Sequence, residues 1–191
     1  MNDATKNAAA LIAPVDAVLH GDRIIAAIKQ SGVRTVVALP DRTTVTGLLR
    51  PLEADRDLRL VRVCKEDEAI GISAALSYCD HRALVLIQYT GLLDSLNAVR
   101  GVAVEYGMPI CMMVGLLGKE PGVAPTRSKQ YGLRIVEPVL DAMEVAHHLI
   151  ETDDDIALIK PAIDTAYAQS RPVVLLVGRS PAAPGGGRAG D

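Results

Sequence analysis

One glutamate in this chain stands where a carboxylate could do chemistry. Glu66 follows an apolar run at 58–63 that predicts a buried strand, and it opens a run with helical spacing at 66–79. One face of that helix carries mostly small side chains, at Ala69, Ile70, Ser73 and Ala74. Such a face lets a flat ligand or another backbone approach closely. Glu66 is therefore expected at the carboxyl edge of a sheet, where open α/β sheets bind ligands.

A purely structural interpretation of this acid is also open. Glu66, Asp67 and Glu68 begin the expected helix, and acidic residues in a first helical turn are favoured by the helix dipole alone. The residues that end the other predicted strands bear on the choice between the two interpretations.

Polar residues lie at the ends of three further predicted strands. These are Pro40-Asp41-Arg42 after the strand 35–39, Gln88-Tyr89-Thr90-Gly91 at the end of the strand 83–88, and a long loop at 115–132 after the strand 109–114. Because carboxyl ends of parallel strands meet at one sheet edge, these residues and Glu66 are expected around a single cleft. Gly91 would permit close backbone approach there, and the amide of Gln88 needs a partner at the end of a buried strand.

Strands and helices alternate along the rest of the chain. Helices are expected at 16–31, 44–54, 66–79, 92–106 and 154–169, with a last strand at 173–177 and a short edge strand at 145–150. The run 83–88 is continuously apolar, as in parallel strands buried on both faces. The pattern predicts an α/β fold with one doubly wound, mostly parallel sheet of five to six strands and helices on both faces. The expected domain spans 14–180, between an N-terminal arm at 1–13 and a disordered tail at 181–191.

Composition excludes several classes of function. Hydrophobic residues make up 49% of the 191 residues, which suffices for a core, although the chain has no Phe or Trp. A net charge of −3 with scattered basic residues argues against nucleic-acid binding. No apolar run is long enough for a membrane helix, and no signal peptide is recognisable, so a cytoplasmic protein is expected.

Metal ligands are not predicted in this chain. The cysteines Cys64, Cys79 and Cys111 are odd in number and lack CxxC spacing, so buried free thiols are expected. His147-His148 fall on the expected edge strand, where alternation points only one of them inward. In Asp153-Asp154-Asp155, Asp153 is expected to cap a helix.

Four segments in order carry a resemblance to a known family. They are Leu39-Pro40-Asp41; Lys65-Glu66-Asp67-Glu68-Ala69, near a pattern Asn-Glu-Gly-x-Ala; Gln88-Tyr89-Thr90-Gly91 with Asn97, near Gln-Asn-Ser-Gly with a later Asn; and Gly115 to Gly122. Over about residues 15–180 the chain resembles the pyrimidine-binding (PYR) domain of thiamine-diphosphate enzymes. Within that superfamily it is similar to sulfopyruvate decarboxylase α subunits and to the matching half of phosphonopyruvate decarboxylases.

The chain departs from the family pattern at several positions. Lys65 replaces an Asn, Asp67 a Gly, Tyr89-Thr90 an Asn-Ser pair, and Leu117 an Arg. These changes keep the cofactor role implied for Glu66, but they leave the identity of the 2-oxo acid open, because the resemblance implies that the loop region touches the substrate.

The resemblance implies thiamine diphosphate as cofactor and a small 2-oxo acid as substrate. Glu66 would be the catalytic residue, hydrogen-bonded to ring nitrogen N1′ of the aminopyrimidine. The remaining cofactor contacts would be Pro40, Asp41, Gln88 and Gly91. The candidates for contact with the substrate anion are Arg42, Thr90, Asn97 and Lys119, with Thr43, Arg127 and Lys129 beside them.

The family's Gly-Asp-Gly motif, which holds the diphosphate through Mg²⁺, is absent from this sequence. The resemblance therefore implies a partner β subunit that carries the motif and holds the metal, in a hetero-oligomer that also self-associates.

Other functions stay open beside a sulfopyruvate decarboxylase subunit. Phosphonopyruvate or another 2-oxo acid could be the substrate, with decarboxylation or carboligation as the reaction. A PYR-like subunit could also be regulatory, without catalysis. A nucleotide-binding domain of flavodoxin or Rossmann type is disfavoured, because Leu39-Pro40-Asp41-Arg42-Thr43 stands where Gly-x-Gly-x-x-Gly would be expected.

Overall fold

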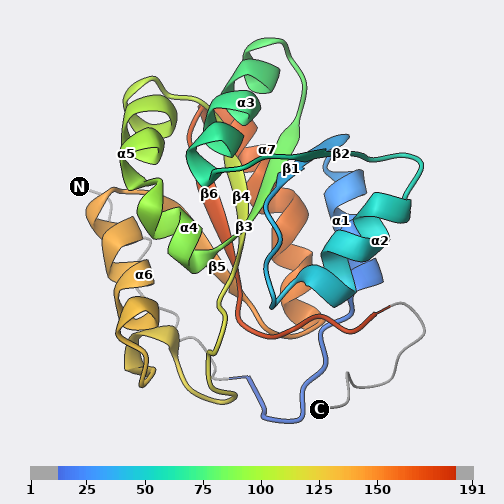
Figure 1. The fold of residues 1–191 in the computed structure, drawn as a ribbon, viewed down its shortest axis with the longest axis vertical. Coiled ribbons are helices and arrows are strands. Elements are labelled where there is room, and N and C mark those ends of the chain that lie inside the picture. Colours follow the sequence, from blue (N-terminus) through green and yellow to red (C-terminus); the bar gives the residue numbers. More distant parts are fainter. Residues whose placement is uncertain (1–12, 184–191) are drawn as a thin grey trace.

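The computed structural model describes residues 13–183 and is built on a single six-stranded sheet (Figure 1). The strands are β1 (Thr35–Ala38), β2 (Arg59–Arg62), β3 (Ala83–Gln88), β4 (Cys111–Gly115), β5 (Ala146–Ile150) and β6 (Val173–Val177). All neighbours are parallel, in the order β2-β1-β3-β4-β6-β5. The strand order reverses between β1 and β3, and ligands of open α/β sheets bind beyond the carboxyl ends of strands at such a switch point.

Helical segments cover both faces of the sheet (Figure 1). On one face lie α1 (Gly21–Gln30), the π-helix η1 (Val45–Leu49), α2 (Arg50–Ala54), the 3₁₀ turn η4 (Asp154–Leu158) and α7 (Ile159–Gln169). On the other lie α3 (Glu66–Tyr78), α4 (Tyr89–Asp94), α5 (Leu96–Ala98), the π-helix η2 (Val99–Glu105) and α6 (Tyr131–Ala142). A short 3₁₀ turn, η3 (Pro125–Arg127), precedes α6.

The strands pack against both helical layers. In β3, Leu84 and Leu86 join the core beneath α1 and α7, whereas Val85 and Ile87 join the core beneath α3 and α6. All four side chains are fully buried. Burial on both sides explains the unbroken apolar runs, and it confirms the predicted doubly wound α/β class with the edge strand included.

Three helices differ from the sequence prediction. Helix α1 begins at Gly21 rather than at residue 16, because His20 instead forms a parallel bridge with Ala182. Helix α4 begins directly at Tyr89, at the end of β3, rather than at residue 92. Helix α6 was not predicted: Pro138 lies inside it, although its buried residues Leu133, Val136 and Leu140 have helical spacing.

The end of the predicted domain also differs. Pro181 and Ala182, assigned above to a disordered tail, lie within the described structure, and Ala182 is buried. Its backbone accepts a hydrogen bond from the Gly21 amide at 3.0 Å and donates one to the Leu19 carbonyl at 2.8 Å. Residues 1–12 of the expected arm and 184–191 of the expected tail lie outside the described residues.

Two expectations about cysteines are wrong. Cys111 is buried in β4, where burial raises the pKa of its thiol to about 12, but Cys64 and Cys79 are exposed. Both follow the ends of regular elements, where the apolar pattern has already stopped.

The side chain of Asp153, in the acidic run 153–155, does not form the predicted helix cap. Asp153 makes no capping bond; its carboxylate accepts the His20 amide at 2.8 Å and the Arg23 guanidinium at 2.6 Å. His147 and His148 are both half-buried on β5, whereas only one was expected to point inward. Burial lowers the pKa of His148.

Residues 13–183 contain neither a metal-binding cluster nor a membrane-spanning helix. No cluster of three or more His, Cys, Asp and Glu side chains could hold a metal ion. The helices within this range are too short or too polar to cross a bilayer.

Candidate active site

The carboxyl edge of the sheet brings Glu66 and Gly91 into contact. Glu66 opens α3 after β2, and Gly91 lies in the first turn of α4 after β3. A Cβ atom added to Gly91 would fall 2.1 Å from Oε1 and 2.3 Å from Cγ of Glu66. The glutamate side chain therefore lies directly on the Gly91 backbone, and no larger residue fits at position 91 without moving it.

The start of α3 separates the roles of its acids. Glu68 Oε2 accepts hydrogen bonds from the backbone amides of Cys64, at 2.9 Å, and Lys65, at 3.3 Å, and so satisfies the start of the helix. Asp67 Oδ1 accepts the amide of Glu68 at 3.0 Å. The half-buried carboxylate of Glu66 makes no hydrogen bond with any residue in 13–183. Capping accounts for Glu68 but leaves the oxygens of Glu66 available.

Asp41 is buried just beyond the end of β1. It is 2% exposed, and its two oxygens accept the amides of Thr43 and Thr44, each at 3.1 Å. Burial raises the pKa of the Asp41 carboxyl, and the amide bonds oppose that rise. A Cβ on Gly115, at the end of β4, would lie 1.9 Å from Asp41 Oδ2. Asp41 thus joins the turn after β1 to the end of β4, across the end of β3.

Gln88 and Thr90 form a polar pair at the end of β3. The hydroxyl of Thr90 donates to Oε1 of Gln88 at 3.0 Å. Gln88 is half-buried and Thr90 is exposed. Pro40 and Arg42 are exposed on either side of Asp41, and the Arg42 guanidinium makes no ion pair within the described part of the chain.

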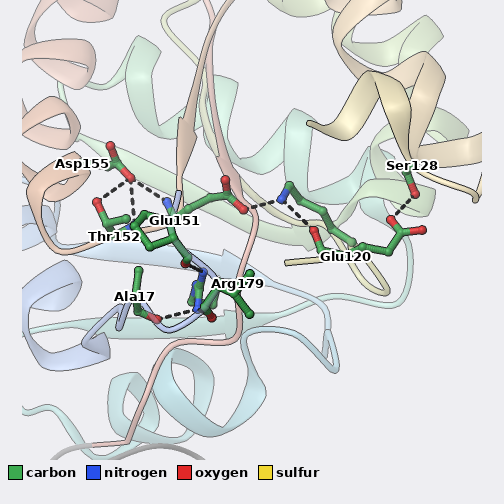
Figure 2. Close-up of polar contacts among 10 residues, drawn as sticks. Ala17, Glu120, Ser128, Glu151, Thr152, Asp155 and Arg179 are labelled. Atoms are coloured by element: carbon green, nitrogen blue, oxygen red, sulfur yellow. Dashed lines mark hydrogen bonds and ion pairs between the residues drawn. The ribbon is translucent and has the colours of Figure 1, made fainter. Parts of the chain in front are cut away.

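The other two substrate candidates have partners of their own. Asn97 Oδ1 accepts Nε and Nη2 of Arg100 at 3.2 and 3.0 Å, on the exposed surface of the α5–η2 helical segment. The Lys119 side chain is fully buried, and its ammonium pairs with the carboxylate of Glu151 and donates to the Glu120 carbonyl at 3.2 Å (Figure 2). The structure thus groups Pro40, Asp41 and Arg42 with their neighbours after β1, joins Glu66 to Gly91, and pairs Gln88 with Thr90. Asn97 and Lys119 bond elsewhere.

The sequence analysis did not name Glu151 at this edge, and it did not anticipate how Tyr89 packs there. Glu151 follows edge strand β5, so its position after a strand was a signal that it lies at the carboxyl edge. Tyr89 is buried, and its hydroxyl donates to Gln130 Oε1 at 3.4 Å. A Cβ on Gly132 would lie 2.9 Å from the Tyr89 ring, so the glycine makes room for it. The contacts of Tyr89 with Gln130 and Gly132 connect residues that are distant in sequence, so no local pattern predicts them.

Comparisons with known proteins agree with the family resemblance seen in the sequence. A scan against protein-family models gave no match. The chain is 28% identical over 159 residues to the sulfopyruvate decarboxylase subunit alpha of Methanococcus maripaludis, covering 82% of this chain and 92% of the relative. It is 26% identical over 151 residues to the subunit of that name from Methanocaldococcus jannaschii, covering 78% and 88%. A longer relative, the sulfopyruvate decarboxylase of Methanosarcina acetivorans, is 26% identical over 159 residues, which are 82% of this chain but 39% of that protein.

A solved structure supports the fold assignment. The 2-oxoglutarate:ferredoxin oxidoreductase of Magnetococcus marinus superposes with a TM-score of 0.62 over 86% of this chain, at 15% identity. The chain spans 30% of that protein's chain. The resemblance recognised in the sequence is thus confirmed: over most of its length the chain is similar to sulfopyruvate decarboxylase α subunits, and its sheet has the PYR-type fold.

Proposed function

We propose that the chain is the α subunit of a thiamine-diphosphate-dependent carboxy-lyase that converts sulfopyruvate to sulfoacetaldehyde and CO₂. The single observation that carries the proposal is the Glu66–Gly91 contact at the switch-point edge. The names of the relatives supply the substrate. The proposed enzyme works in the cytoplasm, where the free thiols of this chain would stay reduced.

The residues at this edge fit the aminopyrimidine of thiamine diphosphate. The Glu66 carboxylate has no hydrogen-bonding partner among the described residues, so its oxygens are available to accept a hydrogen bond from a ligand. Gly91 contributes backbone without a side chain, and the small residues Ala69 and Ser73 lie on the buried face of α3. A flat ring therefore has a donor-seeking carboxylate and a smooth wall to bind against.

Each residue would have a defined role. Glu66 would accept a hydrogen bond from the protonated ring nitrogen N1′ and hold that proton in place. When bound, thiamine diphosphate supplies the thiazolium that accepts the electron pair released with CO₂. Asp41 accepts the amides of Thr43 and Thr44 and would keep the turn after β1 rigid beside the cofactor. Pro40 and the amide of Gln88 would complete the contacts to it.

The sulfonate of the substrate needs cationic or hydroxyl donors. Arg42 and Thr90 are exposed at the ends of β1 and β3, the two strands that flank the switch point. They are our preferred substrate contacts. Lys119 would have to break its buried pair with Glu151 to reach an anion, and Asn97 would have to leave Arg100.

A partner must complete the active site. The sequence lacks Gly-Asp-Gly, so the diphosphate and Mg²⁺ would be held by a β subunit bound over the carboxyl edge. The "subunit alpha" in the names of the relatives supports a partner chain. We further propose that these αβ pairs self-associate.

The proposal is tested by co-purifying the chain with a candidate β subunit and measuring CO₂ release with thiamine diphosphate and Mg²⁺ present. Sulfopyruvate should be decarboxylated faster than phosphonopyruvate or pyruvate. Glu66→Gln should lower kcat by at least about 100-fold, the lower range for a positioned proton-transfer group. If only phosphonopyruvate were decarboxylated, phosphonopyruvate would replace sulfopyruvate as the assigned substrate. Full activity of Glu66→Gln would favour the regulatory-subunit alternative.

A further inference from the structure

The loop between β4 and α6 is anchored at its start by a buried ion pair. The Leu116 amide donates to the Val177 carbonyl at 2.9 Å, in continuation of the sheet. Three residues later the Lys119 side chain, with no exposed surface, pairs with Glu151, whose side chain is 5% exposed (Figure 2). Gly178 leaves room for this carboxylate, since a Cβ there would lie 2.7 Å from Glu151 Cγ.

The middle of the loop is closed on itself. Both oxygens of Glu120 are used. Its Oε2 accepts the Ser128 hydroxyl at 2.7 Å (Figure 2), and its Oε1 accepts the Lys129 amide at 2.9 Å. Gln130 Nε2 donates to the Gly118 carbonyl at 3.0 Å. Residues 116–130 therefore form a closed arch with internal hydrogen bonds.

The far end of the arch reaches the candidate active site. Gln130 accepts the hydroxyl of Tyr89, and Tyr89 is two residues from Gly91, against which Glu66 lies. Tyr89 thus connects the far end of the arch to the start of α4, through this long hydrogen bond of 3.4 Å and through the packing of its ring against Gly132.

An ion pair is an unusual way to hold a loop at a buried position. Desolvating two charges offsets most of their attraction, and apolar residues of similar volume often give equal or greater stability. What a hydrogen-bonded pair adds is a fixed direction and distance. The arch also has room to move: a cavity of about 530 Å³ lies beside the pair, lined by Val15, Pro121 and Arg179 among others. Without a fixed anchor, the loop could shift into that space.

We propose that Lys119 and Glu151 are positioning residues that hold the arch 116–130 as a rigid wall of the substrate site. This inference rests on the proposed decarboxylase function for its substrate. Lys119 would then govern substrate binding through the loop, without touching the anion.

The test replaces the pair with apolar residues of similar length, Lys119→Met with Glu151→Met, in the αβ complex. The melting temperature should stay near that of the wild type. Trypsin cleavage after Arg127 or Lys129 should become about 10-fold faster, because cleavage follows the population of the open loop. KM for sulfopyruvate should rise about 10-fold with kcat little changed, the signature of lost substrate binding.

A control is Lys29→Met with Asp57→Asn, which removes the ion pairs of Lys29 with Asp57 at 2.6 Å and with Asp55 at 3.0 Å, located before β1 and β2 at the opposite edge of the sheet. It should leave KM and loop cleavage unchanged. Wild-type loop cleavage and wild-type KM in the Met–Met variant would overturn the inference. If that variant does not fold, Glu151→Asp, which shortens the carboxylate by one methylene, replaces it with the same two readouts. Loop cleavage is measured without substrate, so failure of the decarboxylase proposal leaves it interpretable.

Discussion

The side chain of Glu66 lies against the backbone of Gly91, so that a single added methyl group would occupy the space of the carboxylate. The two residues begin different helices and are brought together because β2 and β3 both flank β1 in the sheet. The acid and the glycine therefore form one unit, and the glycine sets where the acid can be.

Gly91→Ala should displace the Glu66 carboxylate from its present position. We expect thiamine diphosphate binding by the αβ complex to weaken and kcat to fall by at least about 10-fold, because a misplaced carboxylate loses its alignment with the ring. Isothermal titration with the cofactor and steady-state kinetics measure both.

Gly71→Ala, on the same α3 helix, is the control for that change. A Cβ at Gly71 meets nothing within 4 Å, so alanine should stabilise the helix by roughly 0.5–1 kcal/mol and leave turnover intact. Equal losses of cofactor affinity in both variants would show that the Glu66–Gly91 contact is not the cause.

Glu66 and Glu68 should respond oppositely to substitution. Glu68→Ala removes the acceptor for two backbone amides and should cost roughly 1 kcal/mol of unfolding free energy while activity persists. Glu66→Gln should leave unfolding by urea nearly unchanged, because no hydrogen bond within residues 13–183 depends on it. A Glu66→Gln variant that lost stability as Glu68→Ala does would assign Glu66 a structural role.

Breaking the Lys119–Glu151 pair on one side should be far worse than removing both charges. Lys119→Met alone leaves a buried carboxylate without its cation and should cost about 3–5 kcal/mol, whereas the double Met variant should be near neutral. Urea unfolding of the two single variants and the double variant gives the coupling energy. Additive losses would indicate that the two charges do not interact.

Glu120 should make the arch sensitive to acid. The Ser128 hydroxyl, together with the Lys129 amide, lowers the pKa of this carboxyl from 4.5 to about 2. For a lowered pKa, the stabilising contribution is complete above the unfolded value of 4.5 and is lost as pH falls towards 2. The protection factor of the Lys129 amide, which corrects the hydrogen-exchange rate for its intrinsic pH dependence, should therefore fall over that interval in the wild type. In Glu120→Gln the protection factor should already be low at neutral pH, and identical pH profiles of the two proteins would contradict this role.

Much of the fold was readable from local sequence. Strands such as 83–88 and 173–177 are apolar on both faces because helices cover both sides, and that burial leaves an unmistakable pattern. The proximity of Glu66 and Gly91 was predictable for a related reason. Each residue follows a recognisable parallel strand, and the carboxyl ends of such strands lie at the same edge of the sheet.

What the sequence did not reveal depends on contacts between distant segments. Lys119 was named as a candidate contact for the substrate anion because its partner Glu151 is 32 positions away, and nothing local indicates a buried pair. Helix α6 was missed because Pro138 suggests a break, yet tertiary packing of three buried residues maintains the helix around it. Asp153, read as a cap, is instead drawn to His20 and Arg23 across the fold.

The close contacts among Gly21, Gly47 and Pro181 help to fix the position of η1 and of the turn before it. A Cβ on Gly21 would lie 1.9 Å from the Gly47 carbonyl oxygen, and one on Gly47 would lie 2.1 Å from that of Pro181. Gly47 belongs to η1, the helix whose preceding turn is held by Asp41. The segment after β6 therefore packs against η1, next to the turn that Asp41 holds. Shortening the chain to end before Pro181 would loosen that turn, although every residue proposed to contact the cofactor would still be present.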